Sequence, residues 1–297
     1  MRFLVLGSIN IDESFRVSHI VRPGETLQSA GFSRNAGGKG ANQAAALALA
    51  GANVFLAGKI GSDGIWVLDQ VRGRGADVGL VGVDGCSSTG RAEIMVSDDG
   101  ENAILLCPGC NHLVDESYVN SVVSKFGEGD WIVLQNETSC VPHAIAKAHE
   151  VGMRVVLNPS PFDDAVRNAA IDADMLILNE TEARGVTCAS ADDGFDSLVS
   201  RLAALYSDKD IVLTLGARGS VFIGSGKVIR QDAFEVETID TTAAGDTFLG
   251  YFIASFACGN DPKSALAIAS KASAIAVTRR GAMCSIPTRD EVMRWLF

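Results

Sequence analysis

The sequence predicts an α/β fold: a three-layer sandwich with a mostly parallel central sheet between two helical layers, plus a small β-sheet lid. Two observations predict it. Short apolar runs alternate with helix-length segments along the whole chain, and two pairs of segments alternate apolar and polar residues instead. The 297 residues are 47% hydrophobic and 21% charged, as in ordinary globular proteins. We expect residues 1–297 to form a single domain, with the lid built from about 12–34 and 88–108.

The central sheet is expected from six short runs rich in Val, Ile and Leu. Such continuous apolar runs are typical of parallel strands that are covered on both faces. They lie at residues 3–6, 54–57, 131–135, 154–157, 175–178 and 211–215. Helices are expected at 41–50, 65–71, 142–150, 195–205, 244–258 and 262–278.

The lid is expected from segments whose apolar residues alternate with polar ones. They are residues 13–19 with 27–33, and 91–96 with 103–107. Asp99-Gly100 between the second pair is a strong hairpin signal. Because Ile94, Met95 and Val96 place apolar side chains on both faces, one face lacks a partner within the monomer, and we expect a homodimer formed through the lid.

The charge excludes some partners. The chain has 25 basic and 36 acidic residues, a formal net charge of −11, which argues against a nucleic-acid partner. The longest apolar stretch, residues 44–52, is too short to span a membrane. Met1-Arg2 leads directly into a predicted strand without the features of a signal peptide, so we expect a cytoplasmic protein.

The seven cysteines are scattered without a repeating spacing, which predicts free thiols. Cys107 and Cys110, with His112 nearby, could form a redox pair or half of a zinc site. No second Cys/His pair follows, and a structural zinc site needs four ligands. The intervening Pro108-Gly109 is more simply a turn.

A glycine-rich segment, residues 37–43 (Gly-Gly-Lys-Gly-Ala-Asn-Gln), opens an alanine-rich predicted helix. Glycine lets the backbone approach a ligand there, and the first amides of a helix have no internal acceptor. The segment is neither a Walker A loop nor a dinucleotide fingerprint, since Gly40 follows Lys39 and Gln43 stands where a third glycine belongs. The structural alternative is a tight turn into a helix.

A second cluster of small residues, 240–247 (Asp-Thr-Thr-Ala-Ala-Gly-Asp-Thr), precedes an apolar helix. Amides of Ala243, Ala244, Gly245 and Asp246 at the start of that helix are expected to form an anion hole suited to a transferring phosphoryl group. Asp246 alone could be a helix cap. The three small residues before it favour a functional site, because a cap needs only one.

Seven segments in order carry a resemblance to a known family: 7–12 (Gly-Ser-Ile-Asn-Ile-Asp), 37–43, Asn158-Pro159, 179–182 (Asn-Glu-Thr-Glu), 214–216, 240–247 and 276–281. The sequence resembles the ribokinase-like (pfkB) carbohydrate kinases over nearly its whole length. Many members have glycine in place of Ala243, and the Ala-Ala-Gly-Asp form is similar to those acting on ribose.

The resemblance implies that Asp246 is the general base that takes a proton from a sugar hydroxyl attacking the γ-phosphate of ATP. It implies a sugar pocket formed by Asn10, Asp12, Gly38, Lys39, Asn42, Glu137 and Asp246. From the residues alone, Asn10 and Asp12 could be a turn after a strand, and Glu137 a solvated loop charge.

The resemblance also implies a nucleotide and two cations. It assigns ATP to Asn179, Glu182, Thr214, Gly216, Gly219 and Gly245. Asn179 and Glu182 would help organise Mg²⁺ and the phosphates through water; the alternative is a helix cap with Glu three residues later. It assigns a K⁺ site to Asp240, Thr242, Ala276, Arg279, Gly281 and Ser285. Whether Arg218 reaches a phosphate stays open.

These inferences point to ATP-dependent phosphorylation of the 5-hydroxyl of ribose or a close pentose. One alternative is a related kinase for deoxyribose, fructose or a nucleoside such as adenosine; 6% aromatic residues offer little for a base pocket. Another is a sugar-binding regulator without catalysis, which the intact Asp246 disfavours. A third is a redox protein using Cys107 and Cys110.

Overall fold

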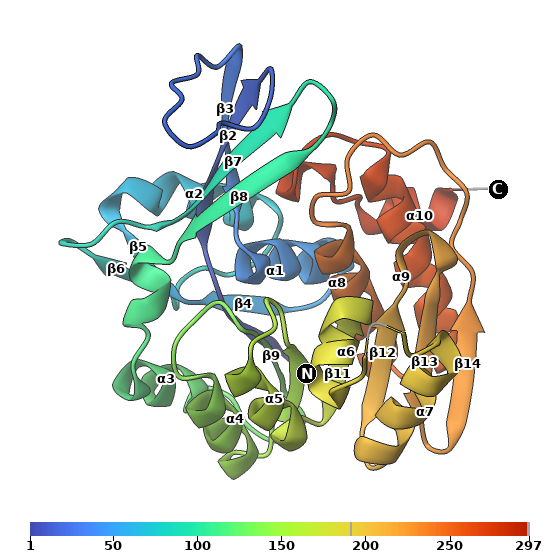
Figure 1. Cartoon of the computed structure of the whole chain (residues 1–297). Helices are drawn as coiled ribbons and strands as arrows, with labels where there is room; N and C mark the ends of the chain where they lie inside the picture. The colour runs from blue at the N-terminus through green and yellow to red at the C-terminus, as the bar shows by residue number, and fades with distance from the viewer. Residues whose placement is uncertain (191, 296–297) are drawn as a thin grey trace.

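The computed structural model describes residues 1–190 and 192–295 and confirms the predicted α/β sandwich (Figure 1). Its central sheet has eight strands in the order β14-β13-β12-β11-β10-β9-β1-β4. These are β1 (Phe3–Leu6), β4 (Val54–Ala57), β9 (Trp131–Gln135), β10 (Arg154–Asn158), β11 (Met175–Asn179), β12 (Asp210–Thr214), β13 (Ser220–Gly224) and β14 (Lys227–Gln231). The strands from β12 to β4 are parallel, and all six predicted strands lie within one residue of their expected bounds.

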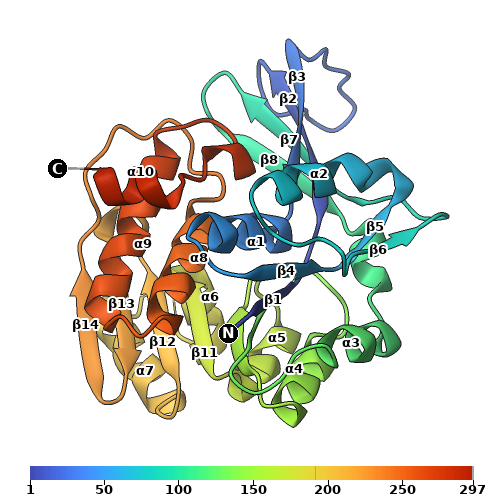
Figure 2. The same cartoon turned by 180° about the vertical axis from the view of Figure 1, so that it is seen from behind.

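Alternate residues of each central strand enter two separate cores, as expected for a sheet buried on both faces. In β1, Phe3 and Val5 pack into one core, whereas Leu4 and Leu6 pack into the other. The first core lies under α1 (Lys39–Leu49), α2 (Ile65–Gly73), α8 (Ala244–Ala257), α9 (Pro262–Val277) and α10 (Arg289–Arg294). The second lies under α3 (Glu116–Val123), α4 (Val141–Glu150), α5 (Asp164–Asp172), α6 (Glu180–Thr187) and α7 (Phe195–Leu205). Figures 1 and 2 show these helices on the two faces of the sheet.

A smaller four-stranded sheet, in the order β3-β2-β7-β8, projects from the main body (Figure 2). Its strands are β2 (Asn10–Val17), β3 (Gly31–Gly37), β7 (Gly90–Ser97) and β8 (Asn102–Cys107). The expected bounds of the first two, 13–19 and 27–33, were wrong. β2 continues directly from the end of β1, and β3 extends to Gly37, where a Cβ would lie 2.0 Å from Asp12 Oδ2, so only glycine fits that position.

Among the strands, two pairings were not predicted. β13 and β14 add an antiparallel hairpin to the edge of the sheet, and β5 (Lys59–Gly61) pairs with β6 (Gly82–Asp84) in a third, two-stranded sheet. β13 is a buried strand of only five residues, and β14 is a mostly exposed edge strand whose sequence, Lys-Val-Ile-Arg-Gln, does not alternate polar and apolar residues. Such short segments give a weak periodic signal.

All seven cysteines are free, as expected. Cys110 is fully buried, whereas Cys107 is exposed at the end of β8. Within residues 1–190 and 192–295, no three His, Cys, Asp or Glu side chains are grouped so as to hold a metal ion. In the same part of the chain, none of the helices has the length and apolar character needed to cross a membrane.

Candidate active site

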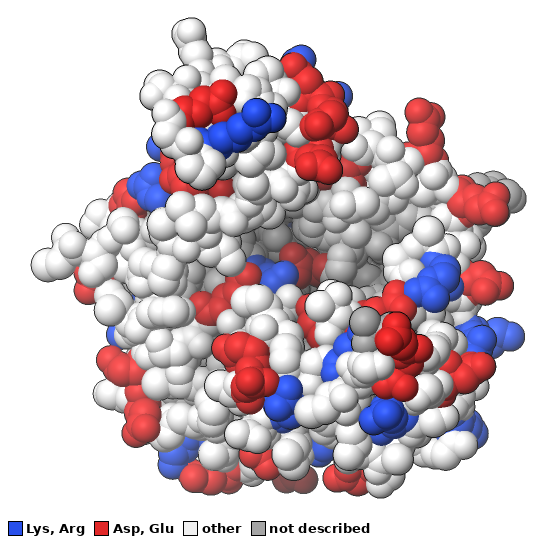
Figure 3. Space-filling model, viewed as in Figure 1, with Lys and Arg blue, Asp and Glu red and all other residues white. Residues whose placement is uncertain are grey.

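The predicted functional residues gather at the carboxyl-terminal edge of the central sheet, where open α/β sheets bind ligands. The starts of α1 and α8 face this edge, and the smaller sheet stands over it (Figure 1). In the space-filling view a hollow opens beneath the smaller sheet, and acidic and basic side chains lie at its floor (Figure 3). The structure therefore brings the site residues predicted from the sequence into one region of the fold.

Glycines bring the start of α1 against the end of β1. Gly38 precedes the helix with a φ of 90°, a left-handed conformation that favours glycine. A Cβ on Gly40 would lie 2.6 Å from the carbonyl carbon of Gly7, so both glycines permit this close approach. The Ala41 amide then donates to the Ser8 carbonyl at 3.0 Å. The glycine-rich segment is thus both a tight turn into the helix and one wall of the hollow.

The start of α8 forms the second wall. Ala243 has a φ of 58° and turns the chain into the helix. The Ala244 amide already donates to the Thr241 carbonyl at 3.2 Å, so it is not free for an anion, contrary to expectation. The amides of Ala243, Gly245 and Asp246 have no acceptor among the described residues. A Cβ on Gly245 would meet no atom within 4 Å, so the helix start is open beside Gly245.

Two side-chain amides from α1 hold the carboxylate of Asp246. Asn42 Nδ2 donates to Asp246 Oδ2 at 3.1 Å, and Gln43 Nε2 donates to Asp246 Oδ1 at 2.9 Å. Asp246 itself is only 9% exposed. The two walls therefore meet at this carboxylate, and each of its oxygens keeps a further lone pair for a ligand.

Asn10 and Asp12 lie within β2 rather than in a turn after β1, which corrects the alternative given above. Asn10 is buried and accepts a hydrogen bond from Asn111 Nδ2 at 2.7 Å. Asn111 also accepts from the Ile9 amide at 3.0 Å, so it fixes the Asn10 side chain. Asn111 was missed because it lies about a hundred residues away, in a short 3₁₀ helix with no motif of its own.

Glu137 is not a solvated loop charge. Its carboxylate accepts hydrogen bonds from the Ser8 hydroxyl and from the Lys39 amide, the latter at 3.4 Å. It therefore joins the end of β1 and the start of α1 in the floor of the hollow. Ser8 was not singled out in the sequence, although it stands inside one of the matching segments.

The floor of the hollow concentrates negative charge. Burial, with the carboxylates of Glu137 and Asp246 nearby, raises the pKa of Asp12 to about 7. Burial likewise raises the pKa of Glu137, although Lys39 opposes the shift. For Lys39, burial disfavours the ammonium, but the carboxylates of Asp246 and Glu137 outweigh burial and raise its pKa. Lys39 is thus a charged partner shared by several carboxylates.

The expected nucleotide residues line the next strand ends. Asn179 and Glu182 form a capping box at the start of α6: Asn179 Oδ1 accepts from the Glu182 amide at 3.0 Å, and Glu182 Oε2 from the Asn179 amide at 2.9 Å. The helix-cap alternative is therefore present in the structure. Thr214 ends β12 and is paired in register with Asn179. Gly216 and Gly219 follow with φ values of 58° and 89°.

Arg218, in the same loop, forms an ion pair with Glu180 beside the capping box. Its side chain is 59% exposed. The structure thus gives Arg218 a protein partner rather than leaving it free in solvent.

The residues assigned to a K⁺ site form one loop junction. Asp240 Oδ2 accepts from the Gly281 amide at 2.8 Å, and Asp240 Oδ1 from the Thr242 amide at 2.9 Å. Burial opposes ionisation of Asp240, but these hydrogen bonds outweigh it and lower the pKa of its carboxyl. Ser285 is fully buried, and the Ala276 carbonyl accepts from the Arg279 amide at 3.0 Å.

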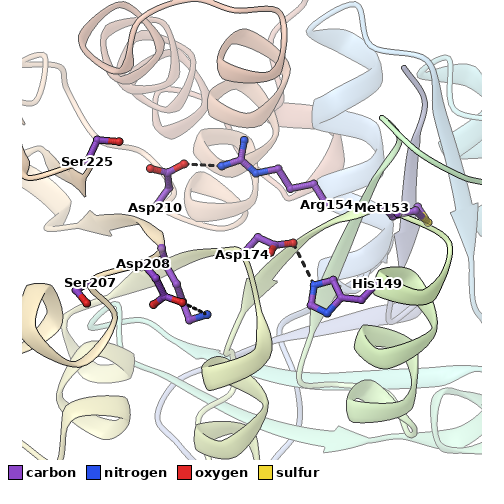
Figure 4. Close-up of a pocket in the computed structure, with 10 residues that line it drawn as sticks. His149, Met153, Arg154, Asp174, Ser207, Asp208, Asp210 and Ser225 are labelled. Atoms are coloured by element: carbon purple, nitrogen blue, oxygen red, sulfur yellow. Dashed lines mark hydrogen bonds and ion pairs between the residues drawn. The ribbon is translucent and has the colours of Figure 1, made fainter.

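A further cavity lies at the amino-terminal edge of the sheet (Figure 4). Its volume is about 640 Å³, and its charged side chains pair with one another: Arg154 with Asp210, and His149 with Asp174 at 3.2 Å. These groups satisfy each other's charge, and the strand starts rather than the strand ends surround them. None of the site residues predicted from the sequence lines this cavity.

Comparisons with known proteins agree with the geometry. The model of the pfkB family carbohydrate kinases matches residues 2–289. A ribokinase of Haemophilus influenzae is 37% identical, over 98% of this chain and 97% of that protein. The crystal structure of ribokinase from Cryptococcus neoformans in complex with ADP superposes with a TM-score of 0.86 at 36% identity, covering 99% of both chains. Ribokinase from Arabidopsis thaliana, complexed with ribose and ATP, gives a TM-score of 0.86 at 26% identity, covering 99% of this chain and 97% of that one. With a matching fold, a family model spanning nearly its full length and relatives this similar, the chain belongs to the pfkB family of carbohydrate kinases.

Proposed function

We propose that this protein transfers the γ-phosphoryl group of ATP to the 5-hydroxyl of ribose or a close pentose. The observation that carries the proposal is the meeting of a buried carboxylate, Asp246, with unpaired helix amides at one point of the hollow. The similar proteins from Cryptococcus and Arabidopsis, crystallised with ADP and with ribose and ATP, support the same pair of ligands.

Asp246 acts as the general base in this proposal. As the sugar oxygen forms its bond to the γ-phosphorus, the hydroxyl proton passes to Asp246, and the bond between that phosphorus and the bridging oxygen of ADP breaks. The amides of Ala243 and Gly245, at the positive end of the α8 dipole, stabilise the charge on the transferring group. The Ala244 amide instead closes the turn before the helix by donating to the Thr241 carbonyl.

The sugar pocket would use groups that both accept and donate, because a sugar presents several hydroxyls. Asn10, Asp12, Gly38, Lys39, Asn42 and Glu137 are the proposed contacts. Asn42 Oδ1 is buried and has no hydrogen-bond partner among residues 1–190 and 192–295, so it can accept from a donor such as a sugar hydroxyl. Asp12 and Glu137 supply further acceptors.

ATP would extend from Gly245 along Thr214, Gly216 and Gly219. Mg²⁺ bound to the phosphates would offset their charge. The donor set fits such an ion: each carboxylate oxygen of Glu182 accepts one hydrogen bond from Asn179 and keeps a lone pair for an ion-bound water. The carboxylates of Asp246 and Glu182 both raise the pKa of Lys39. This supports a position for the ATP phosphates near Lys39, between the proposed sugar and nucleotide residues.

We propose that K⁺ binds at the junction formed by Asp240, Thr242, Ala276, Arg279, Gly281 and Ser285. One carboxylate with mostly backbone carbonyls suits a monovalent cation. The Arg279 guanidinium pairs with Glu291 at 2.6 Å, so only its carbonyl would serve as a ligand. The loop ends where α8 begins, so a bound cation would stabilise the turn that presents the amides.

The raised pKa of Asp12 predicts that ribose is used less well in mild acid. Above pH 7 Asp12 is a carboxylate that can accept from two hydroxyls, and as the pH falls through about 7 it takes up a proton and loses acceptor capacity. We expect kcat/KM for ribose to fall below pH 7, and Asp12→Asn to lower kcat/KM and remove this dependence. A wild-type profile that stays level between about pH 5.5 and about pH 8 would contradict the role of Asp12.

We also propose a homodimer formed through the smaller sheet acting as a lid. Both faces of that sheet expose apolar side chains: Phe32 and Leu105 on one face, 56% and 65% exposed, and Ile104 on the other, 56% exposed. Exposed apolar sheets favour association. Sedimentation equilibrium is expected to give a dimer at micromolar concentration, and a monomer there would count against it.

The substrate is tested by coupled ADP release over ribose, deoxyribose, fructose and adenosine, with and without K⁺. We expect ribose to give the highest kcat/KM and K⁺ to raise it. Faster ADP release with deoxyribose, fructose or adenosine than with ribose would contradict the proposed substrate and favour a related kinase that acts on that compound. Ribose binding with no ADP release would instead identify a non-catalytic regulator.

A further inference from the structure

A buried row of three side-chain amides links Asp246 to the ends of two central strands. Gln43 is fully buried, and its Nε2 donates both to Asp246 Oδ1 at 2.9 Å and to Asn158 Oδ1 at 3.2 Å. Its Oε1 accepts from Gln135 Nε2 at 2.7 Å. Gln135 and Asn158 end β9 and β10 and are paired in register. Every hydrogen-bonding group of the Gln43 amide is therefore used.

The direction of these hydrogen bonds is fixed at both ends of the row. The Ile177 carbonyl can only accept, and it accepts from Asn158 Nδ2 at 2.9 Å, so Asn158 must turn its oxygen toward Gln43. Gln43 must then present its NH₂ group to Asn158 and, with the second hydrogen, to Asp246. Asp246 Oδ1 accepts from this NH₂ group, so the Gln43 amide sets the orientation of the Asp246 carboxyl group.

The fold makes room for this row with glycine. A Cβ on Gly7 would lie 1.8 Å from Gln135 Oε1, and a Cβ on Gly40 would lie 2.7 Å from the Cα of Gly7. Any side chain at Gly7 would displace the Gln135 amide that holds Gln43. Gly7 therefore leaves the space that the Gln135 amide occupies, and this close packing supports the orientation of Gln43.

We propose that Gln43, held by Asn158 and Gln135, is a positioning residue that fixes the plane of the Asp246 carboxylate. The proposal rests on the proposed function, in which Asp246 accepts the proton of the sugar hydroxyl. Asn42 donates to the other carboxylate oxygen, but within the described residues its own Oδ1 has no partner, so only Gln43 ties Asp246 to the sheet.

Gln43→Met, which keeps the chain length and removes the amide, tests this role. We expect kcat to fall by about tenfold to a hundredfold, while the Kd for ribose changes by less than about threefold. In a plot of kcat against pH, the fall in kcat on the acid side, the acid limb, should move to higher pH. The reason is that the Asp246 carboxylate loses a hydrogen bond, and such hydrogen bonds favour the ionised form of a carboxyl group. Gln43→Glu keeps the shape but places a second carboxylate beside Asp246, so the limb should move further in the same direction.

The matched control is Tyr118→Phe, which removes buried hydrogen bonds to Gly58 and Leu80 away from the hollow. It should lower Tm and leave kcat and its pH profile unchanged. If Gln43→Met lowers Tm as the control does while kcat and the acid limb stay at wild-type values, Gln43 is only structural and the proposal is overturned. Where Gln43→Met yields no folded protein, Gln43→Glu gives the same pH readout.

A double substitution separates this proposal from the function on which it rests. If Gln43 acts through Asp246, adding Gln43→Met to Asp246→Asn should lower kcat by less than about twofold further. If Gln43→Met lowers kcat in the Asp246→Asn background as much as it does in the wild type, Gln43 does not act through Asp246. That result would overturn the positioning role of Gln43 and leave Asp246 as the proposed base. An unchanged kcat in Asp246→Asn alone would instead refute the proposed function.

Discussion

Asp246→Asn is expected to lower kcat by about 10² to 10⁴ while changing ribose affinity by less than about tenfold. The substitution removes the group that takes the hydroxyl proton, and it leaves the free amides of Ala243 and Gly245 in place. In the proposed pocket, sugar binding depends mainly on Asn10, Asp12 and their neighbours on other elements. Steady-state ADP release and calorimetry with ribose measure the two quantities separately.

Asp130→Asn serves as the control for loss of a buried carboxylate. Asp130 is 6% exposed and accepts hydrogen bonds from the backbone and side chain of Arg2, before β9 rather than after it. This variant should be less stable than the wild type but equally active. If Asp246→Asn and wild type turn over at equal rates, the assignment of Asp246 as base is wrong.

Gly245→Asp is expected to lower kcat/KM for ATP by at least about 10², without loss of stability. The open space in front of Gly245 accepts a Cβ with no contact within 4 Å, so the protein should fold. An acidic residue in the first turn of a helix is stabilised by the dipole, so Tm should stay level or rise. The same carboxylate would occupy and repel the position of the transferring phosphoryl group.

The control for this variant is Gly194→Asp. Gly194 is the N-cap of α7, has extended backbone at φ −66°, and likewise meets no atom within 4 Å of an added Cβ. It tests the same chemical change at a helix start that no proposed ligand touches. Wild-type activity in both variants would show that α8 does not bind the phosphoryl group, and loss of activity in both would point to a general effect of added charge.

Much of the scaffold followed from periodicity. The central strands are continuous apolar runs because both faces of the sheet are covered, and this pattern placed them within one residue. The bounds of β2 and β3 did not follow, because Asn10 and Asp12 are polar residues that continue a strand out of the core. Their pairing depends on Gly37, whose contact with Asp12 no local pattern reveals.

The candidate site was predictable only in part. Asp246 and the glycine-rich segment, which includes Gln43, stand in motifs, but the contacts of these residues with distant parts of the chain do not follow from the motifs. Asn111 holds Asn10 from about a hundred residues away, and Gln43 meets Asp246 from a distant helix. Such pairs arise from how the walls pack, which sequence spacing does not encode. The engagement of the Ala244 amide by Thr241 likewise depends on the backbone turn at Ala243.

The central claim is that Asp246 accepts the proton of the sugar hydroxyl while the neighbouring amides of α8 bind the transferred phosphoryl group. The most direct measurement is a crystal structure with ribose and a non-hydrolysable ATP analogue. We predict the 5-hydroxyl at about 3 Å from an Asp246 carboxylate oxygen, with the terminal phosphate on the amides of Ala243 and Gly245. Ribose bound with its 5-hydroxyl turned away from Asp246, or the terminal phosphate seated away from α8, would contradict the account.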